Sequence, residues 1–193
     1  MFSRILVAVF VIAFSMAMIF MYTDAAEAQF AEDGLICYLS FDEVDCQTVI
    51  DSMGNHDGAI VGGLEQTDEG KVDKAFLFLR AENEPCITVD EPGAFSAVDD
   101  FTWATWIKST ATGGSFMAMT GGNDVPDEKT WQVTGTLSVE VAWAGVVLTG
   151  SEQVADDAWH YVAMVYEVGT LTFYVDGKED AVGAVTYAGD AAV

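Results

Sequence analysis

Oxygen-bearing side chains crowd one short, turn-rich segment of the sequence. They are Asp42, Glu43, Asp45, Asp51, Asn55 and Asp57. Because Ca²⁺ binds through oxygen ligands alone, such a cluster can form a calcium site, with Asp42 and Asp51 as its candidate ligands. Asp and Asn side chains also bond to their own backbone and tolerate left-handed φ, so the same residues can instead shape turns. The sequence leaves both interpretations open.

A carboxylate pair for glycoside hydrolysis is the nearest approach to catalytic chemistry. Glu43 and Asp45 alternate, so on a strand they would point to the same side, but Gln47 replaces the third acid of a Glu-x-Asp-x-Glu pattern. His160 follows Trp159 at the start of an apolar run, which is typical of a satisfied, half-buried histidine rather than of a catalytic base. We therefore expect no enzymatic activity and assign no catalytic residues.

The tryptophans are the candidate sugar-binding residues, because an aromatic face suits the apolar side of a pyranose. Trp103 and Trp106 fall within one expected strand on opposite faces, and we expect both in the core. Trp131 and Trp143 lie next to expected loops. The sequence therefore favours Trp131 and Trp143 as ligand-binding residues.

The first 28 residues have the form of a signal peptide. Arg4 is followed by an apolar run over residues 5–22 and by small residues ending at Ala28. This run of 18 residues also reaches the length of a spanning helix, so an uncleaved anchor is the alternative. Either reading predicts a domain at residues 29–193 that is secreted or held at the cell surface.

Cysteine and charge agree with an exported domain. One disulfide is expected among Cys37, Cys46 and Cys86, and the sequence does not choose the pairing. The chain has a net charge of −24, and residues 1–28 hold one base and two acids, so residues 29–193 carry −23. This charge repels nucleic acid and anionic membranes, so membrane contact is expected only through an uncleaved amino-terminal segment.

Short runs rich in β-branched and aromatic residues, separated by turn residues, predict an all-β sandwich. The expected strands are 35–41, 59–61, 75–80, 86–89, 101–108, 115–120, 131–134, 137–143, 146–149, 159–166 and 171–175. The run 159–166 is apolar on both faces, which predicts a central, covered strand. Asp176-Gly177 predicts a type I′ hairpin turn, which needs positive φ at both residues.

Six segments, in this order, resemble the laminin G-like and pentraxin-like branch of the concanavalin A-like lectins, as found in bacterial secreted proteins. They are Gly34-Leu35 with Phe41-Asp42-Glu43; Asp51 to Gly58; Gly70-Lys71-Val72 with Lys74-Ala75-Phe76 and Phe78; Phe101-Thr102 with Trp106-Ile107-Lys108; Trp159-His160 with Val162-Ala163; and Gly169-Thr170-Leu171 with Phe173 to Lys178.

The resemblance implies a jelly roll of two antiparallel sheets with a ligand-carrying curved face and, in many members, calcium at the rim. Where the family commonly has Gly-x-Asp-Asp-Tyr-Val, this chain reads Arg80 to Ile87, and Glu82 and Asn83 are the residues there that could supply oxygens. The family's closing strand pair is missing before Val193, so we expect a domain that lacks its last strands.

The resemblance implies a non-catalytic module that binds a polysaccharide or glycoprotein, with calcium as a candidate cofactor. The alternative is an adhesive or structural domain whose partner is another extracellular protein.

Overall fold

The computed structural model describes residues 34–45, 47–79, 85–89, 100–119, 129–141 and 145–185. Every secondary-structure element in these ranges is a β-strand, and all lie in the compact unit Cys37–Val193. The strands are β1 (Leu39–Asp45), β2 (Thr48–Asp51), β3 (Gly58–Val61), β4 (Glu65–Thr67), β5 (Ala75–Leu77), β6 (Cys86–Val89), β7 (Phe101–Lys108), β8 (Ser115–Met119), β9 (Lys129–Val133), β10 (Leu137–Val141), β11 (Gly145–Thr149), β12 (Trp159–Glu167), β13 (Thr170–Val175) and β14 (Lys178–Ala184). The predicted all-β class is confirmed.

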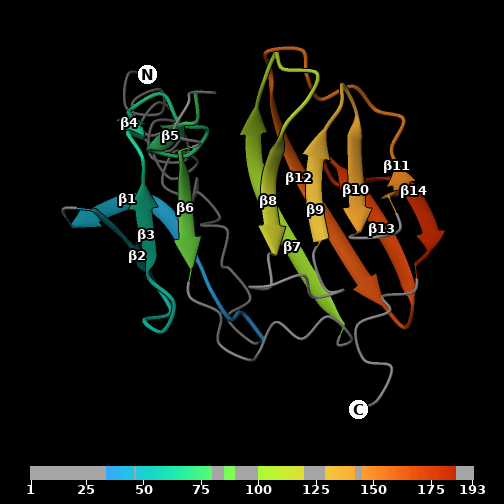
Figure 1. The fold of residues 1–193 in the computed structure, drawn as a ribbon, viewed down its shortest axis with the longest axis horizontal. Helices are drawn as coiled ribbons and strands as arrows, with labels where there is room; N and C mark the ends of the chain where they lie inside the picture. Colours follow the sequence, from blue (N-terminus) through green and yellow to red (C-terminus); the bar gives the residue numbers. More distant parts are fainter. Residues whose placement is uncertain are drawn as a thin grey trace, which may run out of the picture. The chain divides into compact units, whose positions relative to one another are not determined.

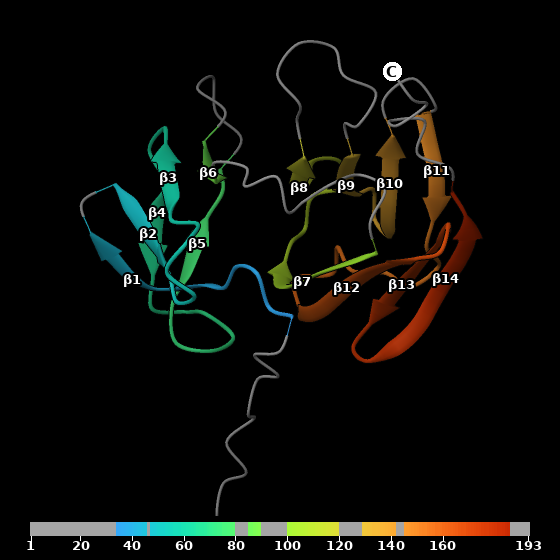
Figure 2. The same cartoon turned by 90° about the horizontal axis from the view of Figure 1, so that it is seen from below.

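Two antiparallel four-stranded sheets form a sandwich in the carboxy-terminal half of the described chain. One has the strand order β14-β13-β12-β7 and the other β11-β10-β9-β8 (Figures 1 and 2). Side chains alternate along the strands, so β12 buries Val162, Met164 and Tyr166 on one face and leaves Tyr161 exposed on the other. β12 is central as predicted, but its second face is only partly covered.

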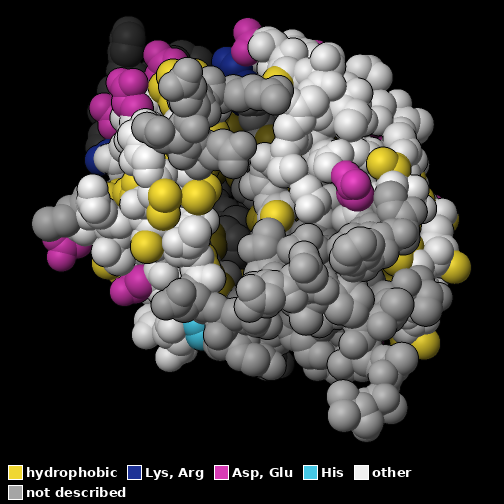
Figure 3. All heavy atoms as spheres, in the orientation of Figure 1, with side chains coloured by type: hydrophobic (Ala, Val, Ile, Leu, Met, Phe, Trp, Pro, Cys, Tyr) yellow, Lys and Arg dark blue, Asp and Glu magenta, His cyan; other side chains and the backbone are white. Residues whose placement is uncertain are grey.

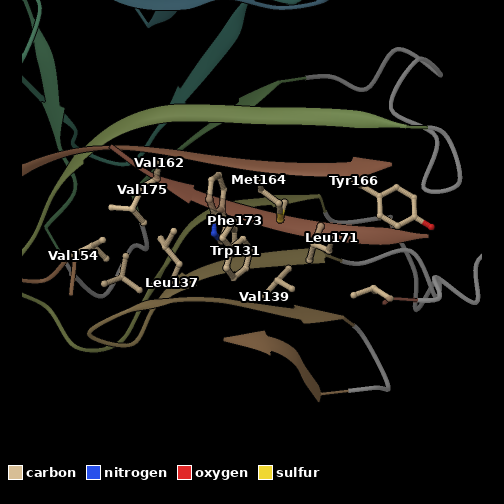
Figure 4. Close-up of a cluster of buried hydrophobic side chains, with 12 residues drawn as sticks. Trp131, Leu137, Val139, Val154, Val162, Met164, Tyr166, Leu171, Phe173 and Val175 are labelled. Carbon is tan, nitrogen blue, oxygen red and sulfur yellow. The ribbon is translucent and has the colours of Figure 1, made fainter. Parts of the chain in front are cut away.

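The core lies between these two sheets (Figure 4). Trp131 of β9 and Phe173 of β13 have no exposed surface, and their rings stack with centroids 6.1 Å apart. Leu137 and Val139 of β10 and Met164 of β12 fill the space around them (Figure 4). Buried apolar area of this kind is the main favourable term in folding, so these contacts fix how the two sheets pair.

The amino-terminal strands form a separate four-stranded sheet, β1-β2-β3-β6, and a two-stranded one, β4-β5. All their pairings are antiparallel. Val49 of β2 is fully buried, and Gly58 of β3 lies against the Ile87 side chain of β6, where a Cβ would collide with it. The sheet is thus tightly packed at the pairing of β3 with β6.

The structure confirms the predicted turn and differs from the sequence prediction at several strands. Asp176 and Gly177 have φ of 51° and 77°, so the predicted type I′ turn between β13 and β14 is confirmed. The first strand begins at Leu39 rather than at Leu35. The short strands β2 and β4 were not predicted, because three or four residues carry too little periodicity to be recognised.

Candidate functional site

The Asp51 carboxylate organises a turn rather than facing solvent. Its Oδ1 accepts hydrogen bonds from the backbone N–H groups of Tyr38 and Met53, at 2.8 and 3.1 Å. Its Oδ2 accepts from the N–H groups of Asn55 and His56, at 3.2 and 3.0 Å. The side chain is 1% exposed. Burial opposes ionisation, but the four N–H donors outweigh it and hold the pKa of Asp51 below its usual value.

Asp42 has a different set of partners. Its Oδ1 accepts the backbone N–H of Lys74 at 3.0 Å, and the side chain lines an open surface hollow with Asp68, Asp73 and Lys74. Within the described ranges, no three His, Cys, Asp or Glu side chains are grouped so that they could hold a metal ion. Glu82 and Asn83 lie outside the described residues, so the four-residue calcium site stays a prediction.

The cysteines do not form the one pairing that can be checked directly. Cys37 and Cys86 are not joined to each other, which removes one of the three pairings that the sequence left open. Cys46 lies outside the described residues, and the two pairings that involve it stay predictions. Burial, followed by the charge of Asp51, raises the pKa of the Cys37 thiol to about 11, so this thiol is protonated and unreactive at neutral pH.

Trp131 is a core residue, so the prediction that it binds a ligand is wrong. Its ring has no exposed surface, lying 4.6 Å from the Phe116 ring and stacked on Phe173 (Figure 4). A sugar at the surface therefore cannot stack on it. Trp143, the second candidate, lies outside the described residues.

An exposed aromatic pair lies instead on the outer face of the sheet β14-β13-β12-β7. Trp106 of β7 and Tyr161 of β12 are cross-strand partners, and each is 38% exposed. Their ring centroids are 5.3 Å apart, with the planes tilted by 56°. The sequence interpretation placed Trp106 in the core, which is wrong; Trp103, the other tryptophan of β7, packs against the core as predicted. We call Trp106 and Tyr161 the aromatic pair.

Small side chains border the aromatic pair on the outer face of the sheet. The next outward-facing row holds Ala104, Ala163 and Tyr174, which the register places side by side. Outward-facing residues two positions apart on a strand are about 7 Å from each other, which is close to the width of a sugar ring. The two alanine methyl groups therefore leave a shallow floor between the aromatic pair and the row that begins at Thr102.

Charged groups lie on or beside this face, among them Lys108 of β7 and Glu179 of β14. The ammonium group of Lys71 lies 5.1 Å from the centroid of the Trp106 ring, within the range of a cation–π contact. The side of the molecule where β8–β11 lie in front shows more acidic than basic side chains (Figure 3), and the chain as a whole carries a net charge of −24. The net charge of the chain disfavours a polyanion as ligand, whereas a neutral ligand meets no such repulsion.

Comparison with known proteins now gives the family. The family described as the concanavalin A-like lectin/glucanases superfamily, in its laminin G-like form, matches residues 82–192, more than half of the chain. The chain belongs to this superfamily. The laminin G-like resemblance and the concanavalin A-like fold are thereby confirmed. Laminin G-like domains are typically binding modules and typically extracellular.

Among solved structures, domains LG4-5 of the mouse laminin alpha1 chain resemble this chain at 22% sequence identity, with a TM-score of 0.42. The similarity covers 48% of this chain and 26% of that one, so this chain spans about a quarter of the laminin structure. No curated protein matches the sequence significantly. The aromatic pair lies within the matched range, whereas Asp42 and Asp51 precede it.

The amino-terminal prediction lies outside the described residues, as residues 1–33 do entirely. In the described ranges no helix is long and apolar enough to cross a membrane. The signal peptide, the anchor alternative and the domain boundary at residue 29 stay predictions.

Proposed function

We propose that the protein is a non-catalytic extracellular module that binds a neutral carbohydrate, free or on a glycoprotein, at the aromatic pair. The observation that carries this proposal is the exposure of Trp106 and Tyr161 side by side on a sheet face. An indole and a phenol ring left half in water have apolar surface to bury, and the C–H face of a pyranose can cover both.

Sugar hydroxyls need hydrogen-bond partners beside an apolar contact. Thr102 is exposed on the same face, and the half-buried Thr172 and Tyr174 of β13 carry hydroxyl groups there. A few polar groups placed around an aromatic platform are the usual composition of a small-molecule site. The small side chains of Ala104 and Ala163 leave room for the sugar ring to approach these hydroxyl groups.

The proposal is tested with a glycan array, after a cooperative thermal melt has shown that the purified protein is folded. Trp106→Ala and Tyr161→Ala should each weaken binding by at least about two- to tenfold, since stacking on an aromatic ring contributes roughly 0.5–1.5 kcal/mol beyond burial. Val182→Ala is the matched control, because it removes an exposed apolar side chain from β14 on the same face. Binding that survives both aromatic substitutions would refute the site.

The ligand class and the cofactor are tested on the same array. The charge of −23 on residues 29–193 predicts binding to neutral glycans and none to sulfated ones. Repeating the assay with a chelator tests the calcium proposal, which fails if binding is unchanged. Release of reducing sugar by the wild type but not by Glu43→Gln would overturn the non-catalytic assignment.

An adhesive, protein-binding role is the second candidate. It is favoured by three consecutive apolar side chains at and after β5, Leu77, Phe78 and Leu79, which are 43%, 54% and 66% exposed. An apolar patch of this kind typically marks a protein contact. Pull-down from extracellular extracts, with Phe78→Ser as the comparison, separates this role from glycan binding. A partner captured equally by the variant would count against it.

A further inference from the structure

His160 lies between two carboxylates that come from different segments. Its Nδ1 is 2.8 Å from Oδ2 of Asp176, in the β13–β14 turn, and its Nε2 is 3.1 Å from Oδ1 of Asp156, in the loop before β12. The His160 side chain is 14% exposed, whereas the two aspartates are about half exposed. The histidine therefore bridges the loop that precedes β12 and the turn that follows β13.

The protonation state of this bridge follows from the donor count. Both aspartates are acceptors when ionised, and a neutral imidazole has a single N–H to donate. Only the imidazolium form can donate to both carboxylates at once. Loss of its proton leaves one carboxylate facing a ring nitrogen lone pair, which is repulsive.

The two carboxylates also hold the backbone around them. Asp156 accepts the N–H of Ala158 at 2.9 Å, and Asp176 accepts the N–H of Tyr161 at 2.9 Å through its second oxygen. The N–H of Asp176 in turn donates to the carbonyl of Tyr161 at 2.8 Å. The loop, the first residues of β12 and the hairpin turn thus meet at His160.

We propose that His160 is a pH-sensitive clamp, which as an imidazolium ties residues 156–158 to the β13–β14 turn and on deprotonation loosens that tie, while residues 150–155 stay held by their own hydrogen bonds. Other contacts hold other parts of the loop: Asp180 of β14 accepts the N–H groups of Ser151 and Glu152 at 2.8 and 2.9 Å. Lys108, on the neighbouring strand β7, pairs with Asp157 at 3.6 Å, and Lys178 acts on Asp176. The clamp needs no ligand and does not rest on the proposed sugar site.

The direction of the pH dependence follows from the neighbours of His160. Burial lowers the pKa of the imidazole, but hydrogen bonds and charge from Asp176 and Asp156 outweigh it and raise the pKa. A raised pKa means that the clamp is fully present below about pH 6.5, the value for an unfolded histidine, and is lost as pH rises through the folded value.

The experiment is an NMR titration of the full-length protein from pH 5 to 9. The chain has two histidines, so the His160 ring signals are assigned by their loss in His160→Gln. We expect the ring to carry two N–H protons at pH 6 and to titrate above about 6.5. Hydrogen-exchange protection at Ala158 should fall as His160 loses its proton.

Two aspartate variants complete the test. Asp156→Asn should move the His160 titration to lower pH, because it removes one of the two charges. Asp157→Asn is the matched control, since this adjacent acid pairs with Lys108, and it should leave the titration nearly unchanged. A singly protonated His160 ring at pH 6, or loop protection that does not change through the titration, would overturn the clamp.

Discussion

Replacing Asp51 by Asn tests whether the acidic segment is built for turn formation. The change keeps the size of the side chain and one oxygen, but it places an NH₂ group opposite two backbone N–H donors. Whichever way the amide turns, two of the four hydrogen bonds are lost. The side chain is 1% exposed, so water cannot readily replace them.

The size of the effect follows from the value of each bond. A hydrogen bond to a charged acceptor contributes roughly 1.5–3 kcal/mol, so the loss of two costs at least about 3 kcal/mol. That is a large part of a typical stability of about 5–15 kcal/mol. In a domain of this size it corresponds to a fall in Tm of about 6–12 °C.

The assay is urea denaturation of wild type and Asp51→Asn from pH 7 down to pH 2. Asp45→Asn is the matched control, because Asp45 is exposed on β1 and its replacement removes the same charge. The pKa of Asp51 is lowered in the fold, so its stabilisation is present above the unfolded value of about 3.9 and is lost as pH falls through the folded value. The difference between wild type and variant should therefore be constant near neutrality and shrink in acid. A variant no less stable than Asp45→Asn would refute this account.

Two further substitutions test the sandwich itself. Gly150→Ala should destabilise by about 1–3 kcal/mol in urea, because a Cβ would collide with the Asp180 carboxylate, which accepts hydrogen bonds from Ser151 and from the Glu152 N–H. In an Asp180→Ala background, Gly150→Ala should lower the free energy of unfolding by less. An equal loss in both backgrounds would show that collision with the Asp180 carboxylate is not the cause. Val168→Asn should raise stability by about 1 kcal/mol, because Val168 is 85% exposed and holds φ at 46°, which Asn tolerates far better than a β-branched residue. A Tm equal to or below that of the wild type would contradict this reasoning.

The elements that could be predicted are those whose signal is local. The eleven expected strands all overlap observed ones, because β-branched and aromatic runs between turn residues specify extended backbone without reference to the rest of the chain. The Asp176-Gly177 turn is local in the same sense. β2 could not be found because its four residues lie inside a segment rich in turn formers.

The tryptophans show what a local pattern cannot supply. Alternation along β7 predicts that Trp103 and Trp106 lie on opposite faces, and they do, but alternation does not say which face another sheet will cover. Trp131 adjoins a stretch expected to be loop, yet Phe116 of the adjacent strand β8 and Phe173 of the facing sheet enclose it. The choice between core and binding residue is therefore made by sheet packing, which depends on residues far away in the sequence.

Turn formation explains part of the acidic composition of the chain. Asp42, Asp51 and Asp180 all accept backbone N–H groups, as do the two aspartates beside His160. These carboxylates satisfy donors in turns and loops that lack a strand partner, and they do so best when ionised. Lowering the pH relieves the repulsion of a strongly negative chain, but it also protonates these acceptors. The pKa values of Asp51 and Asp176 are lowered in the fold, so their stabilisation is present above the unfolded value of about 3.9 and is lost as pH falls through the folded value. The hydrogen bonds to Asp51 and Asp176 should therefore persist to lower pH than those to a carboxylate with an ordinary pKa.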